Sequence, residues 1–149
     1  MKEEMKAHDF GPPDLEFLGF KLWISGRQFS DSKDYWDGNW IVITACCTAP
    51  LSEVFAHGPF LHLPELAMWQ TEPKKLHNRI EGNAELKCME PNLNAVVKLN
   101  SQGTGTFTVR LTPDPIKQKH QVEFEIDQSY LPEVIRQIEV NLEKFPIRT

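Results

Sequence analysis

Three aspartates and two histidines have side chains of the types that bind metal ions, and their spacing decides whether they could do so. Asp31, Asp34 and Asp37 recur every third residue and offer the carboxylate oxygens that Ca²⁺ or Mg²⁺ prefers. The EF-hand spacing D-x-D-x-D-G is missing, so solvated charges are the expected role. His57 and His62 lie five residues apart without a cysteine or an acid at ligand spacing, which disfavours a transition-metal site.

Signatures of catalysis are missing from the sequence. It contains no P-loop, dinucleotide fingerprint, H-E-x-x-H, C-x-x-C or G-x-S-x-G motif. The segment 103–105 (G-T-G) joins two expected strands and opens no helix, which predicts a hairpin turn rather than a phosphate site. Glu85 and Glu90 fall on opposite faces of an expected strand, so they cannot act on one bond. We therefore predict no catalytic residue, no metal and no cofactor; an unrecognised hydrolase or metal-dependent enzyme is kept as a third alternative.

The segment 34–40 (D-Y-W-D-G-N-W) places large aromatic side chains among acids, directly before an expected core strand. Two interpretations stay open. Either Trp40 anchors the core while Tyr35 and Trp36 cover its edge, or Tyr35 or Trp36 stays exposed as an anchor for a basic partner. A second acidic surface is expected on the outer face of the strand around residue 124. The candidate partner-binding residues are Asp31, Asp34, Tyr35, Trp36, Asp37, Glu123 and Glu125.

Composition limits the class of protein. Of the 149 residues, 40% are hydrophobic and 25% are charged, which is typical of one globular domain and not of a disordered chain. The 16 Lys and Arg residues against 21 Asp and Glu residues give a net charge of −5. The basic footprint of a nucleic-acid-binding protein is therefore missing.

Targeting signals and cysteine usage predict the compartment. No apolar run approaches the roughly 18–20 residues that span a bilayer, and the charged start is unlike a secretory signal. Cys46, Cys47 and Cys88 fit reduced thiols better than a disulfide framework, because their number is odd and two are adjacent. We expect a cytoplasmic protein that binds neither nucleic acid nor membranes.

The elements that must position these residues are mostly strands. Residues 1–14 read as a polar, loosely ordered lead-in that ends in Pro12-Pro13, and residues 15–149 as a single domain. Periods of two and β-branched runs predict the strands, while residues 49–62 are expected to be irregular. The expected strands are Leu15–Trp23, Asn39–Thr48, Ala84–Glu90, Leu93–Leu99, Thr106–Thr112 and Gln121–Asp127.

Two helical regions complete the expected fold. Pro64 favours a helix start, whereas Pro73 predicts a break near Glu72. A second helix from Tyr130 to Lys144 follows from an apolar stripe at helical spacing. The expected fold class is α+β: an antiparallel sheet or sandwich of six to seven strands with two helical regions packed on it.

Four stretches of the chain form a pattern when they are taken together. They are Asp34-x-x-Asp37-x-Asn39-Trp40-Ile41, Leu61-x-x-x-Glu65-Leu66-x-x-Trp69, Glu90-Pro91-Asn92-Leu93 and, after the last helix, Phe145-Pro146-x-Arg148. In residue type and order they resemble the WapI-type immunity proteins, small bacterial cytoplasmic proteins grouped with contact-dependent toxin systems. Physically, the shared residues indicate structural roles: Asn39 fixes a turn, Trp40 and Trp69 pack together, and Pro91 marks a sheet edge or bulge.

The resemblance implies a non-enzymatic protein that binds and blocks a toxin domain, and it carries no catalytic residues. Our first hypothesis is therefore an immunity protein that covers a basic toxin surface. The alternative is a structural or regulatory interaction module, for example a homodimer that uses the same acidic sheet face of this protein.

Overall fold

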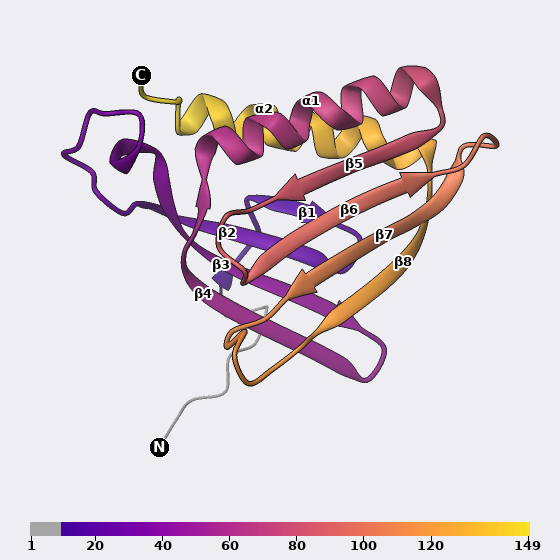
Figure 1. Ribbon diagram of the computed structural model, residues 1–149, viewed down its shortest axis with the longest axis horizontal. Helices are drawn as coiled ribbons and strands as arrows, with labels where there is room; N and C mark the ends of the chain where they lie inside the picture. The colour runs from indigo at the N-terminus through magenta and orange to yellow at the C-terminus, as the bar shows by residue number, and fades with distance from the viewer. Residues whose placement is uncertain (1–9) are drawn as a thin grey trace.

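Two antiparallel sheets of four strands and two helices make up the computed structural model, which describes residues 10–149 (Figure 1). One sheet contains β1 (Leu15–Phe17), β2 (Phe20–Arg27), β3 (Trp40–Ala49) and β4 (Ser52–His62), and the other contains β5 (Gly82–Lys87), β6 (Leu93–Leu99), β7 (Thr104–Leu111) and β8 (Gln121–Asp127). The helices are α1 (Leu63–Arg79) and α2 (Leu131–Lys144), and the short 3₁₀ turns η2 (Asp37–Asn39) and η3 (Gln128–Tyr130) precede β3 and α2. The α+β class with antiparallel strands is confirmed. The strands of the described residues, however, number eight in two sheets, not six to seven in one sandwich.

The inner faces of the two sheets share one hydrophobic core. Along β7, Phe107 and Val109 are buried, while Thr106 and Arg110 point to the other face, as the period of two predicts. The ring of Phe107 meets Phe17 of the first sheet edge-on, with centroids 4.5 Å apart. Burial of this apolar surface between the sheets is the main stabilising contribution to the fold.

The first expected strand is in fact a hairpin. In β1 and β2, Leu15 lies opposite Leu22 and Phe17 lies opposite Phe20. Leu18 adopts a φ of 57°, in the left-handed region that turns a chain sharply. A single strand over residues 15–23 would place Leu15 and Phe17 on the opposite face from Phe20 and Leu22, so the expected single strand is wrong. The chain reverses between the two pairs, and all four side chains are buried.

Residues 49–62 are not irregular as expected, since most of them form β4 at the edge of the first sheet. Gly58, with a φ of 156°, lies beside an irregularity in the pairing with β3, and Pro59 follows it. A Gly-Pro pair normally interrupts a strand. An edge strand accommodates it because one side of its backbone has no partner in the sheet.

Helix α1 continues through Pro73, where a break was predicted. A proline inside a helix removes one backbone hydrogen bond and costs about 3 kcal/mol. Pro73 is itself buried, together with Leu66, Trp69 and Leu76 of the same helix. Tertiary packing of this face therefore outweighs the local preference for a break.

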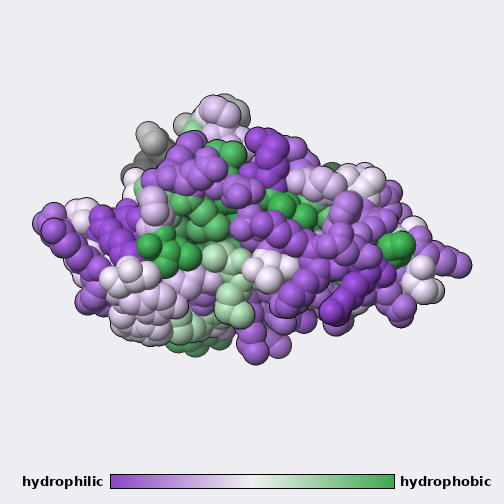
Figure 2. Space-filling model, turned by 90° about the horizontal axis from the view of Figure 1, so that it is seen from above, coloured by the Kyte–Doolittle hydropathy of each residue, from purple (hydrophilic) through white to green (hydrophobic). Residues whose placement is uncertain are grey.

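Both helices lie across the same end of the molecule (Figure 1). Helix α1 packs along β5, an edge strand of the second sheet, and also against α2. The C-terminus returns beside the loop that joins β2 to β3. Seen from the helix side, apolar surface gathers between hydrophilic margins (Figure 2). Some apolar surface therefore stays exposed on this side of the molecule.

The predicted lead-in over residues 1–14 falls mostly outside the described residues. Its last residues contact β2: the Trp23 indole donates a hydrogen bond to the carbonyl of Gly11 at 3.1 Å, and the Asp14 carboxylate accepts one from the backbone of Ile24 at 2.6 Å. Over residues 10–149, neither helix is both long and apolar enough to cross a membrane.

Candidate functional site

The loop between β2 and β3 carries the acidic aromatic segment. One carboxylate oxygen of Asp34 accepts hydrogen bonds from the backbone N–H groups of Asp37 at 2.6 Å and Gly38 at 3.2 Å. This closes the turn in the way that aspartate side chains commonly do. Asp34 therefore shapes the loop, whereas Asp31 and the Asp37 side chain are exposed on it.

Asn39 is buried at the base of this loop and joins it to the C-terminal segment. Its side-chain amide donates to the carbonyl of Tyr35 at 2.6 Å and to that of Arg148 at 2.8 Å, and its oxygen accepts from the backbone of Arg148 at 2.8 Å. The Arg27 guanidinium adds bonds to the carbonyls of Gly38 and Pro146. These contacts connect two motif stretches more than a hundred residues apart, so the loop is held by side chains and not by strand pairing.

Four rings meet where this loop reaches the start of α1, and we call them the rim cluster: Tyr35, Trp36, Trp40 and His62. The buried His62 ring lies 5.6 Å from Tyr35, 5.1 Å from Trp36 and 4.8 Å from Trp40, measured between ring centroids. Its Nε2 lies 2.9 Å from the carbonyl of Trp36 and donates to it. Tyr35 and Trp36 nevertheless remain 48% and 53% exposed. Trp40 is only partly buried and pairs with Trp36 and His62, while Trp69 lies fully buried on α1.

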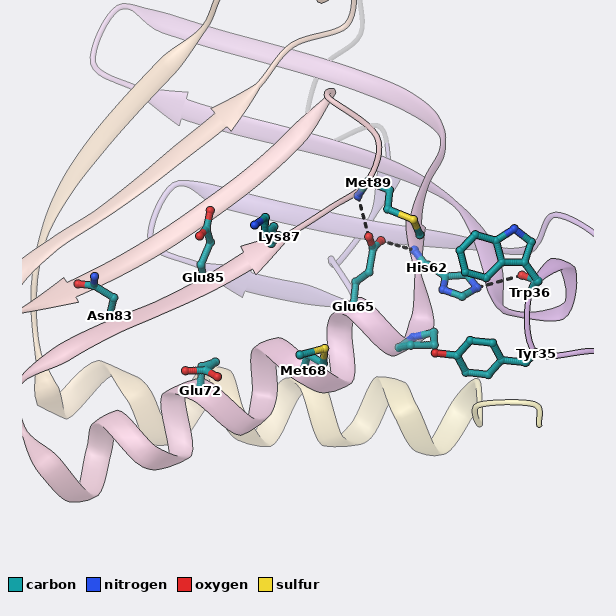
Figure 3. A pocket seen from close by; sticks show the side chains of 11 residues that line it. Tyr35, Trp36, His62, Glu65, Met68, Glu72, Asn83, Glu85, Lys87 and Met89 are labelled. Carbon is teal, nitrogen blue, oxygen red and sulfur yellow. Dashed lines mark hydrogen bonds between the residues drawn. The ribbon is translucent and has the colours of Figure 1, made fainter.

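Glu65, in the first turn of α1, joins the other two motif stretches. One carboxylate oxygen accepts from the backbone of His62 at 2.9 Å, and the other accepts from the backbone of Met89 at 2.7 Å (Figure 3). Burial raises the pKa of Glu65, and the two backbone hydrogen bonds partly counteract that rise. This carboxylate therefore fixes the segment before the E-P-N-L stretch onto the start of the helix.

A groove of about 570 Å³ opens between the β2–β3 loop, α1 and β5. Figure 3 shows the lining side chains: those of Tyr35 and Trp36 at one end, Met68 and Glu72 from the helix, and Asn83, Glu85 and Lys87 from the strand. The remaining lining residues are His62, Pro64, Glu65 and Met89. We refer to this space as the groove.

The groove has an apolar end and a charged end. Besides the two aromatic rings, its apolar end holds Met68 and Met89, which are 69% and 54% exposed. The charged end holds Glu72, Glu85 and Lys87. Large apolar side chains that stay exposed together beside charges are typical of an interaction surface. The groove is therefore suited to recognition of a partner.

The titratable groups described in the groove, and two cysteines outside it, have these properties. The only carboxylate in the groove whose pKa is clearly shifted, Glu65, is occupied by two backbone N–H groups. In residues 10–149 no three His, Cys, Asp or Glu side chains come together in a way that could hold a metal ion. Burial raises the pKa of Cys47 to about 12 and also raises that of Cys88, which disfavours the reactive thiolate form of both.

The structure brings some of the sequence-predicted partner-binding residues together and separates others. Asp31, Asp34, Tyr35, Trp36 and Asp37 share the β2–β3 loop. Glu123 and Glu125 are exposed on β8, at the opposite edge of the second sheet from β5. With three strand spacings of about 4.8 Å between the edges, these two acids lie outside the groove.

Of the helix and strand residues that line the groove, the sequence singled out Glu65 as a motif residue and considered Glu85 only as a catalytic carboxylate. It did not single out Met68, Glu72, Asn83 or Lys87. Met68 lies beside the buried stripe of α1, and Glu85 alternates outward on β5, as solvated residues do. The one usable signal was that Met68 and Met89 are large apolar residues at positions where the period predicts exposure. Nothing local shows that α1 and β5 lie side by side with the loop.

Several of the motif residues are buried. Asn92 is buried, and its side chain donates to the carbonyl of Thr112 at 3.0 Å, while Thr112 returns a backbone bond to Asn92. Leu66 and Leu93 are buried in the core. Pro91 lies just before β6, in the turn after β5.

Comparison with protein families gives one match that covers most of the chain. The model of the "Immunity protein WapI-like family" matches residues 14–146. No curated protein and no solved structure is similar enough to the chain to be matched.

Proposed function

Since the chain belongs to the WapI-like immunity protein family, we propose that it is a non-catalytic bacterial protein that binds a cognate toxin domain. In this proposal it neutralises the toxin by covering a basic surface, not by a reaction. The family supports the toxin-binding role, and the net charge of −5 supports a basic partner.

The observation that carries the proposal is the exposed but immobilised pair Tyr35 and Trp36. Hydrogen bonds from the Asn39 and His62 side chains fix their loop. Both rings therefore lose little conformational entropy when a partner binds. Aromatic side chains held in this way are the usual energetic centre of a protein interface. We place the centre of the toxin contact on this loop and on the groove beside it.

Acidic residues around the aromatic pair give the proposed surface a negative charge. Asp31 and Asp37 lie exposed on the same loop, and they would steer a basic domain toward it. Glu123 and Glu125 belong to a separate acidic strip on β8, which we propose as a secondary contact for a large partner.

A cytoplasmic location is part of the proposal. Cys46, Cys47 and Cys88 are free thiols, as is usual in a reducing compartment. An immunity protein in the cytoplasm meets a toxin domain that has entered the cell.

The proposal predicts that a large secreted protein with a toxin domain at its C-terminus is encoded next to this one. The test is neutralisation of that domain, expressed by itself. Wild-type protein should restore growth of cells that express this domain and should bind it in calorimetry. The double change Tyr35→Ala and Trp36→Ala should weaken binding by more than tenfold.

A matched control is Tyr130→Ala, because Tyr130 is also an exposed aromatic residue (43%) but lies outside the groove. It should bind the toxin domain like wild type. Failure of the wild-type protein to bind or to rescue would refute the proposed function. Equal weakening by both variants would refute the assignment of the loop as its centre.

The same exposed apolar residues favour one second candidate, a homodimer formed through the groove. Tyr35, Trp36, Met68 and Met89 together could be covered by another copy of the chain. Light scattering at high concentration separates the two: a monomer would exclude the homodimer, and a dimer lost in Trp36→Ala would support it.

A further inference from the structure

Resting on the proposed function, we infer that the groove takes up one basic side chain of the toxin domain, an arginine, with its aliphatic stem at the apolar end and its guanidinium between Glu72 and Glu85. The groove rather than the loop acids would then select the partner. An arginine requires apolar surface for its stem and carboxylates for its guanidinium. The loop, the helix and the strand around the groove together supply both.

The aromatic end suits the aliphatic stem of an arginine. Trp36 and Tyr35 expose ring surface beside the groove, with their ring centroids 6.5 Å apart. The methylene groups of a long basic side chain cover such apolar surface while the charged head extends beyond it. In this position the guanidinium lies past the rings, at the charged end of the groove.

The methionines suit the stem of the same side chain. Met68 from α1 and Met89 from the segment after β5 are unbranched and more than half exposed. Thioether side chains adapt their shape to an apolar occupant. The methylene groups of a long basic side chain are an apolar occupant of this kind.

The carboxylates provide the charge. Glu72 and Glu85 both line the groove, from the helix and from the strand (Figure 3). Glu85 is oriented by Asn94, whose side-chain amide donates to its Oε2 at 2.8 Å, which leaves Oε1 available. The only ion pair formed within residues 10–149 joins Glu133 to Arg136, so neither groove carboxylate is neutralised by a described cation.

Charge also decides against a purely apolar occupant. An apolar side chain in the groove would remove Glu72 and Glu85 from water without a partner, which is unfavourable. A guanidinium can bond a carboxylate through two parallel N–H groups. Lys87 is the only cation in the lining, and its flexible side chain is exposed and can turn toward solvent.

The experiment uses the full chain and a probe that is independent of any toxin: N-acetyl-arginine amide, titrated while the tryptophan indole N–H signals are followed by NMR. The Trp36 signal, assigned with Trp36→Phe, should shift with saturation and a Kd of about 1 mM, as expected for a ligand of this size. N-acetyl-citrulline amide, which has nearly the same shape without the charge, should bind at least fivefold more weakly.

Two matched double variants separate the groove from bulk charge. Glu72→Gln with Glu85→Gln should weaken binding of the arginine probe at least fivefold, whereas Glu139→Gln with Glu143→Gln removes the same charge from α2, outside the groove, and should leave it unchanged. All four positions are partly or fully exposed, so both variants should keep the wild-type melting temperature.

The outcomes keep the inference apart from the proposed function. Equal binding of citrulline and arginine probes, or equal weakening in both double variants, would overturn the inference. So would full toxin binding by Glu72→Gln with Glu85→Gln, and in that case the toxin-binding role would stand. Saturable arginine binding with no toxin neutralisation would support the groove assignment and refute the function.

Discussion

Two aromatic clusters in this protein differ in how far their rings are buried. Between the sheets, Phe107 is fully buried against Phe17 and Phe20. At the rim, Tyr35 and Trp36 pack on a buried histidine but keep about half of their surface exposed. Burial of the first cluster stabilises the fold. The exposed apolar surface of Tyr35 and Trp36 contributes little to folding, and a partner can still bury it.

The difference arises from what surrounds the rings. The phenylalanines come from strands whose alternate residues must face the opposite sheet. Tyr35 and Trp36 lie on a loop that is fixed by hydrogen bonds from Asn39 and His62 instead of by packing on all sides. A loop held by polar contacts can be rigid and exposed at once, which suits recognition. Four variants test this comparison, from the largest expected effect to the smallest.

Phe107→Ala should destabilise the fold by about 3–5 kcal/mol, because it leaves a cavity where the two sheets meet. Urea unfolding followed by circular dichroism would measure the loss. A loss below about 1 kcal/mol would mean that the sheets do not pack as described.

Asn39→Ala should cost about 2–4 kcal/mol, since it removes a buried side chain that makes three hydrogen bonds to backbone groups. It should also loosen the rim cluster and so weaken partner binding. Asn39→Asp keeps the oxygen that accepts from Arg148 but places a carboxylate oxygen against the carbonyls of Tyr35 and Arg148, so it should destabilise the fold at least as much. Unchanged hydrogen exchange of the β2–β3 loop in Asn39→Ala would contradict the role of this residue as a clamp.

Trp36→Ala should change the unfolding free energy by less than about 1 kcal/mol, because half of its surface is already exposed. Partner affinity should fall by more than tenfold in the same variant. Comparing urea unfolding with calorimetric binding gives both numbers. A stability loss as large as that of Phe107→Ala would show that the two clusters do not differ in role.

Glu133→Gln tests an exposed charge that belongs to neither cluster. Hydrogen bonds from Arg136 and then Gln137 lower the pKa of Glu133 to about 2 in the folded protein. A carboxyl group with a lowered pKa stabilises the fold above its unfolded pKa, and this contribution is lost as pH falls toward the folded value. The melting temperature of wild type should therefore exceed that of Glu133→Gln slightly at pH 7, and the gap should shrink between about pH 4.5 and pH 2. Solvent screening keeps the effect small. A difference in melting temperature that widens toward low pH would contradict a stabilising contribution from the lowered pKa of Glu133.

Much of the fold was predictable because it depends on local periodicity. The strands around Phe107 and Phe124 alternate as expected, and α2 occupies nearly its predicted range. The errors came at Leu18, Gly58 and Pro73, where residues that normally turn or break a chain meet a tertiary setting that overrides or redirects them. Leu18 turns one expected strand into two, while the edge of a sheet and a buried helix face accommodate the other two.

The candidate site was predictable only in part. The sequence singled out Tyr35 and Trp36 but left open whether they are exposed, and the structure shows that they are. It could not join them to Met68 and Glu85, because proximity between a loop, a helix and a strand depends on how the two sheets and α1 pack together.

By itself the sequence determined what depends on neighbours along the chain: the apolar alternation of the strands, the stripe of α2, the acidic charge and the absence of catalytic motifs. Only the tertiary structure decided which exposed residues share one surface. Burial is set by long-range packing, so a tryptophan at residue 36 and one at residue 69 look alike in the sequence, yet one lies at the rim of a groove and the other in the core.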